Sequence, residues 1–421
     1  MLTNTLTTEP VRKLFFRYLI PSICGTMVTS IYVLADTIII GKGIGIDAMA
    51  ALNIILPLFN IFFGTGLLFG VGGSVLMSIA RGKGDTQTGN CYFSVAVLLN
   101  AITCILYMIL FLNFMEPIAR FLGATDVTMP YVLNYAPYVI LGLGFFAFST
   151  FLQTFVRNDG APKLSMIAVV SGGVLNVVLD IVFVFPCKMG MAGAAIASVL
   201  GSVLTTVILL FHFRSKSNGL HFSLKKFSPV FITSIYKNGF TSFLVEVSSG
   251  IVMFVFNLQI LKYIGDIGVS MYGVITNTAI VVICLCNGIN QASQPIISTN
   301  HGAGLIDRIE TVKKLGLRTA FIICSVPAVL GLIVPNLFTY IFMNPNEQIL
   351  ALSSTAIRIY FVGFFVIGLN MFIIGYFSIY SKTTAFIVPL SFQRVCTCNY
   401  LCICAASAYR SHWNLGICTA C

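Results

Sequence analysis

The sequence predicts an all-α polytopic membrane protein with two pseudo-symmetric lobes of six helices each. The prediction rests on three observations: few charges, long apolar runs, and a second half that repeats the first. Hydrophobic residues make up 57% of the 421 residues and charged residues only 9%, whereas about 25% of the residues of a soluble domain are charged. The apolar runs are continuous and do not alternate, which excludes a membrane β-barrel.

The apolar runs mark the expected membrane spans, because each is near the roughly 20 residues that a helix needs to cross a bilayer. In chain order they lie at about 15–40, 48–79, 91–113, 131–156, 164–186, 191–213, 232–261, 270–300, 314–342 and 352–380. A weaker run begins near residue 384. We therefore expect about ten or eleven spans of a twelve-helix pattern.

Lys and Arg are concentrated on one side of the expected spans. They gather in the N-terminal segment and in every second connection, so the positive-inside rule places the N-terminus in the cytoplasm. The net charge of +11 is then an orientation signal. We expect a multi-pass protein of the cell (inner) membrane whose partner is the lipid bilayer, with no nucleic-acid partner.

The most polar connection, His212–Lys226, divides the chain into two similar halves. Ser22 of the first half aligns with Ser242 of the second, and Gly82 aligns with Gly302, in agreement with the span boundaries. Halves with an even number of spans start on the same side, as in the parallel repeats of secondary transporters, whose sites lie between the halves. The expected units are an N-terminal lobe at 1–213, a cytoplasmic connector at 214–231, a C-terminal lobe at 232–390 and an atypical tail at 391–421.

Three carboxylates fall inside the apolar runs: Asp36, Asp180 and Glu246. A charge in a hydrocarbon-spanning helix is costly, so such a residue faces a cavity or a partner and indicates an ion or substrate path. Asn176 lies one turn before Asp180, and the i, i+4 spacing puts both on one helix face. We expect Asp36 and Asp180 at a similar depth, where the group could bind a proton or Na⁺. The alternative is that each acid caps a helix end or meets interfacial water.

In the second half, Glu246 lies near the middle of its span. Asn370 of the tenth span is the polar residue that we expect to face it, and Gln291 and Gln294 flank this region from the eighth span. A buried Glu–amide pair with a purely structural role is the alternative interpretation.

The sequence contains no enzyme constellation. The four His residues lie in loops or in the tail without metal-ligand spacing, and there is no G-x-x-x-x-G-K-[ST] phosphate loop. We therefore expect no enzyme activity, no metal site and no cofactor, with an ion gradient instead of ATP as the source of energy.

The end of the chain departs from the repeat. It holds the only Trp, Trp413, and Cys-x-Cys pairs such as Cys396 and Cys398, where the repeat predicts further spans. We interpret 391–421 as the product of a reading-frame slip near residue 391. A genuine Cys-rich tail and a soft-metal site are the alternatives.

Several short stretches resemble those of the multidrug and toxic compound extrusion (MATE) family. They are Ala35-Asp36-Thr37 with Ile40-Gly41, Arg157 to Pro162, Asn176 with Asp180, Gly193 to Ala197, and Gln294-Pro295-Ile296. The resemblance implies a V-shaped exporter of twelve helices that exchanges H⁺ or Na⁺ for cationic, amphipathic drugs. It also implies that Asp36, Asn176 and Asp180 form the cation site of the first lobe. Some members pair a seventh-span Glu, here Glu246, with a tenth-span Asp, where this sequence has Asn370.

We therefore expect a secondary active antiporter that acts as a monomer by alternating access and exports cationic amphipathic drugs or toxic organic compounds. One alternative is a lipid-linked oligosaccharide flippase of the same wider superfamily. Flippases line their cleft with Arg and Lys, however, and no Lys or Arg falls in the middle of a span here. The other alternative is a membrane-embedded binding or scaffold protein without transport.

Overall fold

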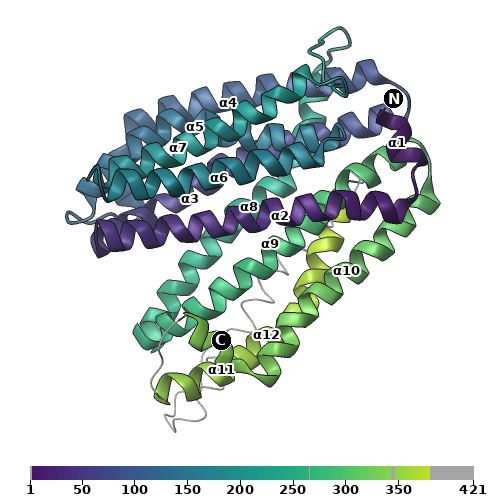
Figure 1. The fold of residues 1–421 in the computed structure, drawn as a ribbon. Coiled ribbons are helices and arrows are strands. Elements are labelled where there is room, and N and C mark those ends of the chain that lie inside the picture. Colours follow the sequence, from purple (N-terminus) through teal and green to yellow (C-terminus); the bar gives the residue numbers. More distant parts are fainter. Residues whose placement is uncertain (1, 265, 343–346, 380–421) are drawn as a thin grey trace.

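The computed structural model describes residues 2–264, 266–342 and 347–379. Within these ranges every regular element is a helix (Figure 1). The helices are α1 (Leu2–Thr8), α2 (Val11–Gly43), α3 (Ile46–Gly82), α4 (Thr86–Phe121), α5 (Met129–Asn158), α6 (Pro162–Val184), α7 (Gly190–Leu210), η1 (Phe211–Arg214), α8 (Pro229–Ile264), α9 (Asp266–Gly302), α10 (Ile306–Ile333), α11 (Pro335–Phe342) and α12 (Glu347–Ser378). The weak run near 384 and the 391–421 tail, with its interpretation as a frame slip, lie outside the described residues.

Nine of the described helices are long and apolar enough to cross a membrane. They are α2 to α7 of the first half and α9, α10 and α12 of the second. Helix α8, with 36 residues, is as long as its counterparts. The prediction of an all-helical, polytopic membrane protein is confirmed.

The prediction of one continuous span at 314–342 is wrong. Helix α10 ends at Ile333, and a separate short helix, α11, begins at Pro335. Between them, Val334 has φ −129° and ψ 62°, outside the α region. The break has its cause in Pro335, because proline lacks a backbone N–H and disfavours the α conformation at the residue before it.

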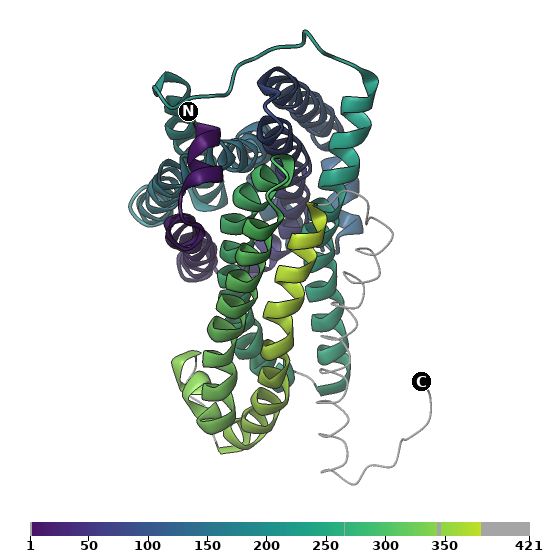
Figure 2. The same ribbon diagram turned by 90° about the vertical axis from the view of Figure 1, so that its right-hand side faces the viewer.

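The helices form two lobes that meet at one end and diverge towards the other (Figures 1 and 2). We call the end where they meet the apex; it holds the N-terminus, the connector and the turn between α9 and α10. Helices α2 to α7 form the first lobe. Helices α9 to α12, with the second half of α8, form the second lobe.

Clusters of buried apolar side chains explain this outline. Away from the apex each lobe has its own core, one around Tyr135 in the first lobe and one formed by α9 to α12 in the second. At the apex one core joins Phe15 of α2 to Ile296 of α9, across the two lobes. Another joins Phe155 of α5 to Ile235 in the first half of α8, the helix that continues into the second lobe. In the described residues, burial of apolar area therefore joins the lobes at the apex.

Glycines let α3 approach α8 and α9 closely at the apex. A side chain on Gly72 would overlap the Ile235 carbonyl of α8, and one on Gly82 would overlap the Thr299 carbonyl of α9. Gly302, which aligns with Gly82 in the sequence repeat, packs on the same contact from the second lobe. Small residues permit close helix packing in membranes, and here they bring backbone against backbone at the apex.

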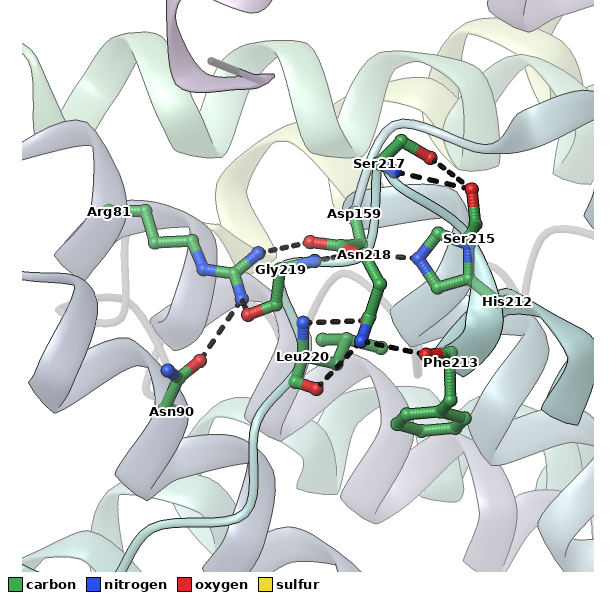
Figure 3. Close-up of polar contacts among 10 residues, drawn as sticks. All are labelled: Arg81, Asn90, Asp159, His212, Phe213, Ser215, Ser217, Asn218, Gly219 and Leu220. Atoms are coloured by element: carbon green, nitrogen blue, oxygen red, sulfur yellow. Dashed lines mark hydrogen bonds and ion pairs between the residues drawn. The ribbon is translucent and has the colours of Figure 1, made fainter.

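The connector lies along the first lobe, held by a polar cluster that we call the connector network (Figure 3). The fully buried carboxylate of Asp159 accepts from Arg81 Nη1 and from His212 Nε2, the latter at 2.6 Å. The backbone N–H of Gly219 donates to the same carboxylate at 2.8 Å, and the Gly219 carbonyl accepts from Arg81 Nη2 at 2.5 Å. The turn between α5 and α6 is thereby tied both to α3 and to the connector.

Two further contacts hold the last part of the connector. The backbone N–H of Ser223 donates to Ser94 Oγ at 2.7 Å, and Lys226 Nζ lies 2.8 Å from Asp85 Oδ2. The Lys226 ammonium, with the Thr88 backbone N–H second, holds the pKa of the Asp85 carboxyl below its usual range. Both side chains of this ion pair are partly exposed, so the pair positions the chain more than it stabilises the fold.

The N-terminal helix α1 crosses the lobe boundary at the apex. Arg308 of α10 donates to the backbone carbonyls of Leu6 at 3.1 Å and Glu9 at 2.7 Å. Asn300 of α9 also donates to the Leu6 carbonyl, at 3.1 Å. The segment before α2 is continuous with the first lobe, yet its carbonyls are bound by the second.

Candidate functional site

Small residues bring α2, α6 and α7 together in the region of the first-lobe acids. Gly172 of α6 packs directly on Gly201 of α7, and a side chain on either residue would overlap the backbone of the other helix. The next residue, Gly173, lies against the ring of Tyr32 on α2. This close approach brings the short polar side chains of the three helices within reach of one another.

Asp36 of α2 and Asp180 of α6 lie side by side. Their carboxyl groups are close enough for one, when protonated, to hydrogen-bond to the other. Asn176 lies beside Asp180, and its Nδ2 donates to Ser198 Oγ of α7 at 3.2 Å. Asp180 has no exposed surface and Asn176 is 2% exposed. Asp36 is partly exposed. The three residues singled out in the first half thus form one compact cluster, in which Asp180 and Asn176 are buried.

The acids have few donors in the part of the chain that the structure describes. There, neither oxygen of Asp180, nor Oδ1 of Asp36, nor the amide oxygen of Asn176 has a hydrogen-bond partner. A buried, ionised carboxylate without donors or a counter-charge is strongly disfavoured. The pair is therefore suited to hold a proton, or to bind a cation through carboxylate and amide oxygens.

In the part of the chain that the structure describes, Asp36 and Asp180 do not belong to a larger cluster of metal-ligand residues. Among the described residues, no group of three or more His, Cys, Asp or Glu side chains is placed to hold a metal ion.

Tyr135 of α5 lies beside the acids and Ser198 of α7 lies beside Asn176, and sequence reasoning identified neither. Tyr135 is fully buried, and its hydroxyl lies near both acids without a hydrogen-bond partner among the described residues. No sequence signal separates Tyr135 from Tyr131 or Tyr138 on the same helix. Its place in the site follows from the rotation of α5 against α2 and α6, which only the packed fold determines.

The polar candidates of the second lobe lie on three helices. Glu246 of α8 is partly buried and lies close to Cys284 of α9. Further along α9 towards the apex, Gln291 accepts from Arg157 Nη1 of the first lobe at 2.8 Å. Gln294 is 8% exposed, and its Nε2 has no partner among the described residues.

Asn370 lies on α12, where that helix packs on α9. The backbone carbonyl of the next residue, Met371, accepts from Asn290 Nδ2 at 3.0 Å. Asn370 itself is partly buried. The pair of acids within apolar runs therefore lies in the first lobe. The second half has one such acid, Glu246 of α8.

Comparison with known sequences gives a consistent result over most of the chain. The MatE family model matches residues 21–182 and 240–396. The multidrug export protein MepA of Staphylococcus saprophyticus is 24% identical over 371 residues, which cover 87% of this chain and 81% of that protein. MepA of Staphylococcus aureus strain MSSA476 is 25% identical over 372 residues, covering 86% and 81%.

Solved structures share the fold. An outward-facing multidrug resistance MATE family transporter of the MOP superfamily superposes with a TM-score of 0.85 at 24% identity, covering 93% of this chain and 87% of that one. The MATE multidrug transporter DinF-BH superposes with a TM-score of 0.83 at 27% identity, covering 91% and 86%. Both likenesses extend over the two lobes.

Proposed function

Since this chain belongs to the MatE family, whose members are membrane transporters and not enzymes, we propose that it is a secondary active antiporter. In this proposal it exports cationic amphipathic drugs or toxic organic compounds, and H⁺ or Na⁺ enters in exchange. The observation that carries the proposal is the pair of Asp36 and the buried Asp180 beside Asn176.

Drug export is supported by the names of the relatives. The staphylococcal proteins are multidrug export proteins, and DinF-BH is a multidrug transporter. The preference for cationic cargo is supported by the chemistry of the first lobe, where the buried charges of the site are carboxylates.

Exchange follows from the cost of leaving the acid pair uncompensated. A proton or Na⁺ at Asp36 and Asp180 offsets part of their negative charge, and a bound organic cation does the same. Binding of one cation then lowers the affinity for the other, which is a coupling free energy between the two ligands. Two lobes that meet at one end and diverge at the other are suited to alternating access around a site between them.

We place the apex in the cytoplasm, because the connector and the turn after α3 carry Lys and Arg. In this orientation the N-terminus is cytoplasmic, the protein lies in the cell (inner) membrane as a monomer, and the arrangement of lobes is that of a state open to the outside. The acid pair then lies in the outer half of the first lobe, within reach of the entering ion.

The test is transport in everted membrane vesicles with an imposed proton or Na⁺ gradient and ethidium as the fluorescent cation. Asp36→Asn and Asp180→Asn keep the shape of each side chain but remove the titrating group. We expect each variant to lose gradient-driven ethidium transport while the folded protein remains in the membrane.

The matched control is Asp47→Asn, the same chemical change at an exposed acid at the start of α3. It should retain transport. Glu246→Gln should reduce transport less than the first-lobe variants if the first lobe alone couples the ion; an equal loss would mean that both lobes are used. Transport at the level of the unaltered protein in both first-lobe variants would overturn the proposal.

A further inference from the structure

A buried guanidinium lies between the lobes at the apex. Arg157, at the end of α5 in the first lobe, is 3% exposed, and its Nη1 donates to Gln291 Oε1 on α9 of the second lobe at 2.8 Å. Because this bond crosses the lobe boundary, any movement that separates the lobes at the apex must break it.

Arg157 has no acidic partner in the described part of the chain. None of the ion pairs there includes it, and the nearest acid in sequence, Asp159, is already engaged by the donors of the connector network. Its ionisable neighbour is the buried phenol of Tyr18 on α2. A single amide oxygen compensates a buried cation poorly, since taking a charge out of water is costly without a counter-charge.

Neighbouring polar atoms also lack partners. Arg157 Nε, Gln294 Nε2 and Ser22 Oγ are buried without a hydrogen-bond partner among the described residues. Gln294 follows on α9, and Ser22 adjoins Ile23, whose backbone packs on Gly288 of that helix. This part of the lobe boundary is polar, yet within the described residues these three atoms lack the hydrogen bonds that would compensate for lost water.

We propose that Arg157 and Gln291 form a reversible latch between the lobes, held closed by their hydrogen bond and made openable by the buried charge of Arg157. When the apex opens, water reaches the guanidinium and removes the cost of its burial. The hydrogen bond favours the closed apex, and the cost of burying the charge favours the open one. Arg157 is therefore a positioning residue that sets the ratio of closed to open apex. This inference rests on the alternating access of the proposed function and names the contact that has to open.

The latch predicts that two of its variants shift the ratio of closed to open apex in opposite directions. Gln291→Leu leaves Arg157 buried with no hydrogen-bond partner among the described residues, so the apex should open. The double variant Arg157→Met with Gln291→Leu removes the charge as well, and an apolar boundary should close the apex beyond its original state. If the bond were only a structural contact, both variants would loosen the apex in the same direction. Gln291→Glu gives Arg157 a counter-charge and should also close it.

The ratio can be measured by double electron–electron resonance on the full chain in lipid nanodiscs. Spin labels go on Lys163→Cys of α6 and Ile306→Cys of α10, two exposed positions on different lobes at the apex, in a background without native cysteines. Thr339→Val is the control, because Thr339 Oγ1 makes a buried hydrogen bond, 3.0 Å to Ser353 Oγ, that lies within the second lobe.

We expect Gln291→Leu to raise the ratio of the long to the short distance at least tenfold, and the double variant and Gln291→Glu to lower it. The control should leave the ratio unchanged. A shift of Gln291→Leu and the double variant in the same direction, or no shift in Gln291→Glu, would overturn the latch. If Gln291→Leu fails to fold, Gln291→Glu still decides.

Ethidium transport by the same proteins separates this inference from the proposed function. An active protein whose variants all shift in one direction overturns the latch and leaves the antiporter proposal standing. Opposite shifts in a protein that does not transport ethidium support the latch and count against the antiporter proposal.

Discussion

Replacing Asp159 by alanine removes the acceptor on which the connector network depends. The side chain of Asp159 is fully buried, that of His212 is 1% exposed, and that of Arg81 is 11% exposed. The substitution leaves the guanidinium of Arg81 without its counter-charge and the N–H of Gly219 without its acceptor. The connector should therefore detach from the first lobe more often.

The magnitude follows from the burial of these groups. Breaking a buried ion pair by removing one partner costs about 3–5 kcal/mol. We take about 3 kcal/mol, because Arg81 keeps its bonds to the Gly219 carbonyl and to Asn90. At about 1.4 kcal/mol per factor of ten, local opening of the connector becomes roughly a hundredfold more frequent.

Limited trypsin digestion measures this opening, because Arg214 and Lys216 are exposed in the connector. When opening is fast relative to cleavage, the cleavage rate follows the population of the open form. Asp85→Ala is the control, because it removes the acid of the partly exposed pair with Lys226 and should change the rate only a few-fold. Equal cleavage rates in the two variants would refute the reasoning.

Two shorter predictions follow. Gly172→Ala places a methyl group against the backbone of Gly201. It should destabilise the protein by about 1–3 kcal/mol, which is measured as a lower melting temperature in detergent. Gly144→Ala is the control, because its methyl group meets nothing within 4 Å, and an equal loss of stability in both variants would count against packing as the cause. In a background without native cysteines, Ser217→Cys should react with a membrane-impermeant maleimide only from the cytoplasm, and Phe121→Cys, at 89% exposure, only from outside. The reverse pattern would show that the apex faces outward.

Sequence reasoning located the first-lobe acids because their signal is local. A carboxylate inside an apolar run stands out on its own, and the spacing of Asn176 and Asp180 places them on one helix face before any packing is known. That Asp36 lies against them required only that two parallel spans bring their outer ends together. The membrane-spanning helices could also be predicted from the sequence, because continuous apolar runs of this length are typical of such helices.

The rest depended on packing that no local pattern encodes. Tyr135 belongs to the site through the rotation of α5, and Arg157 is buried at the apex although it follows the expected span directly. Asp159 looks like a loop acid in the sequence, yet the connector folds back over it and excludes water. Pro335 marks the break at Val334 in the sequence. The run at 314–342 is apolar on both sides of this proline, however, so hydropathy predicts a single span.

Helix α8 has a mechanical consequence for the whole molecule. It is one continuous helix whose first half packs in a core of the first lobe and whose second half runs with the second lobe (Figure 2). Its contact with the first lobe includes Gly72 against Gly239, backbone to backbone. A rotation of about 10° at this contact would move the far end of α8, about 38 Å away at 1.5 Å per residue, by about 6.5 Å. A small rotation at these two glycines would therefore produce a large change in the separation of the lobes far from the apex.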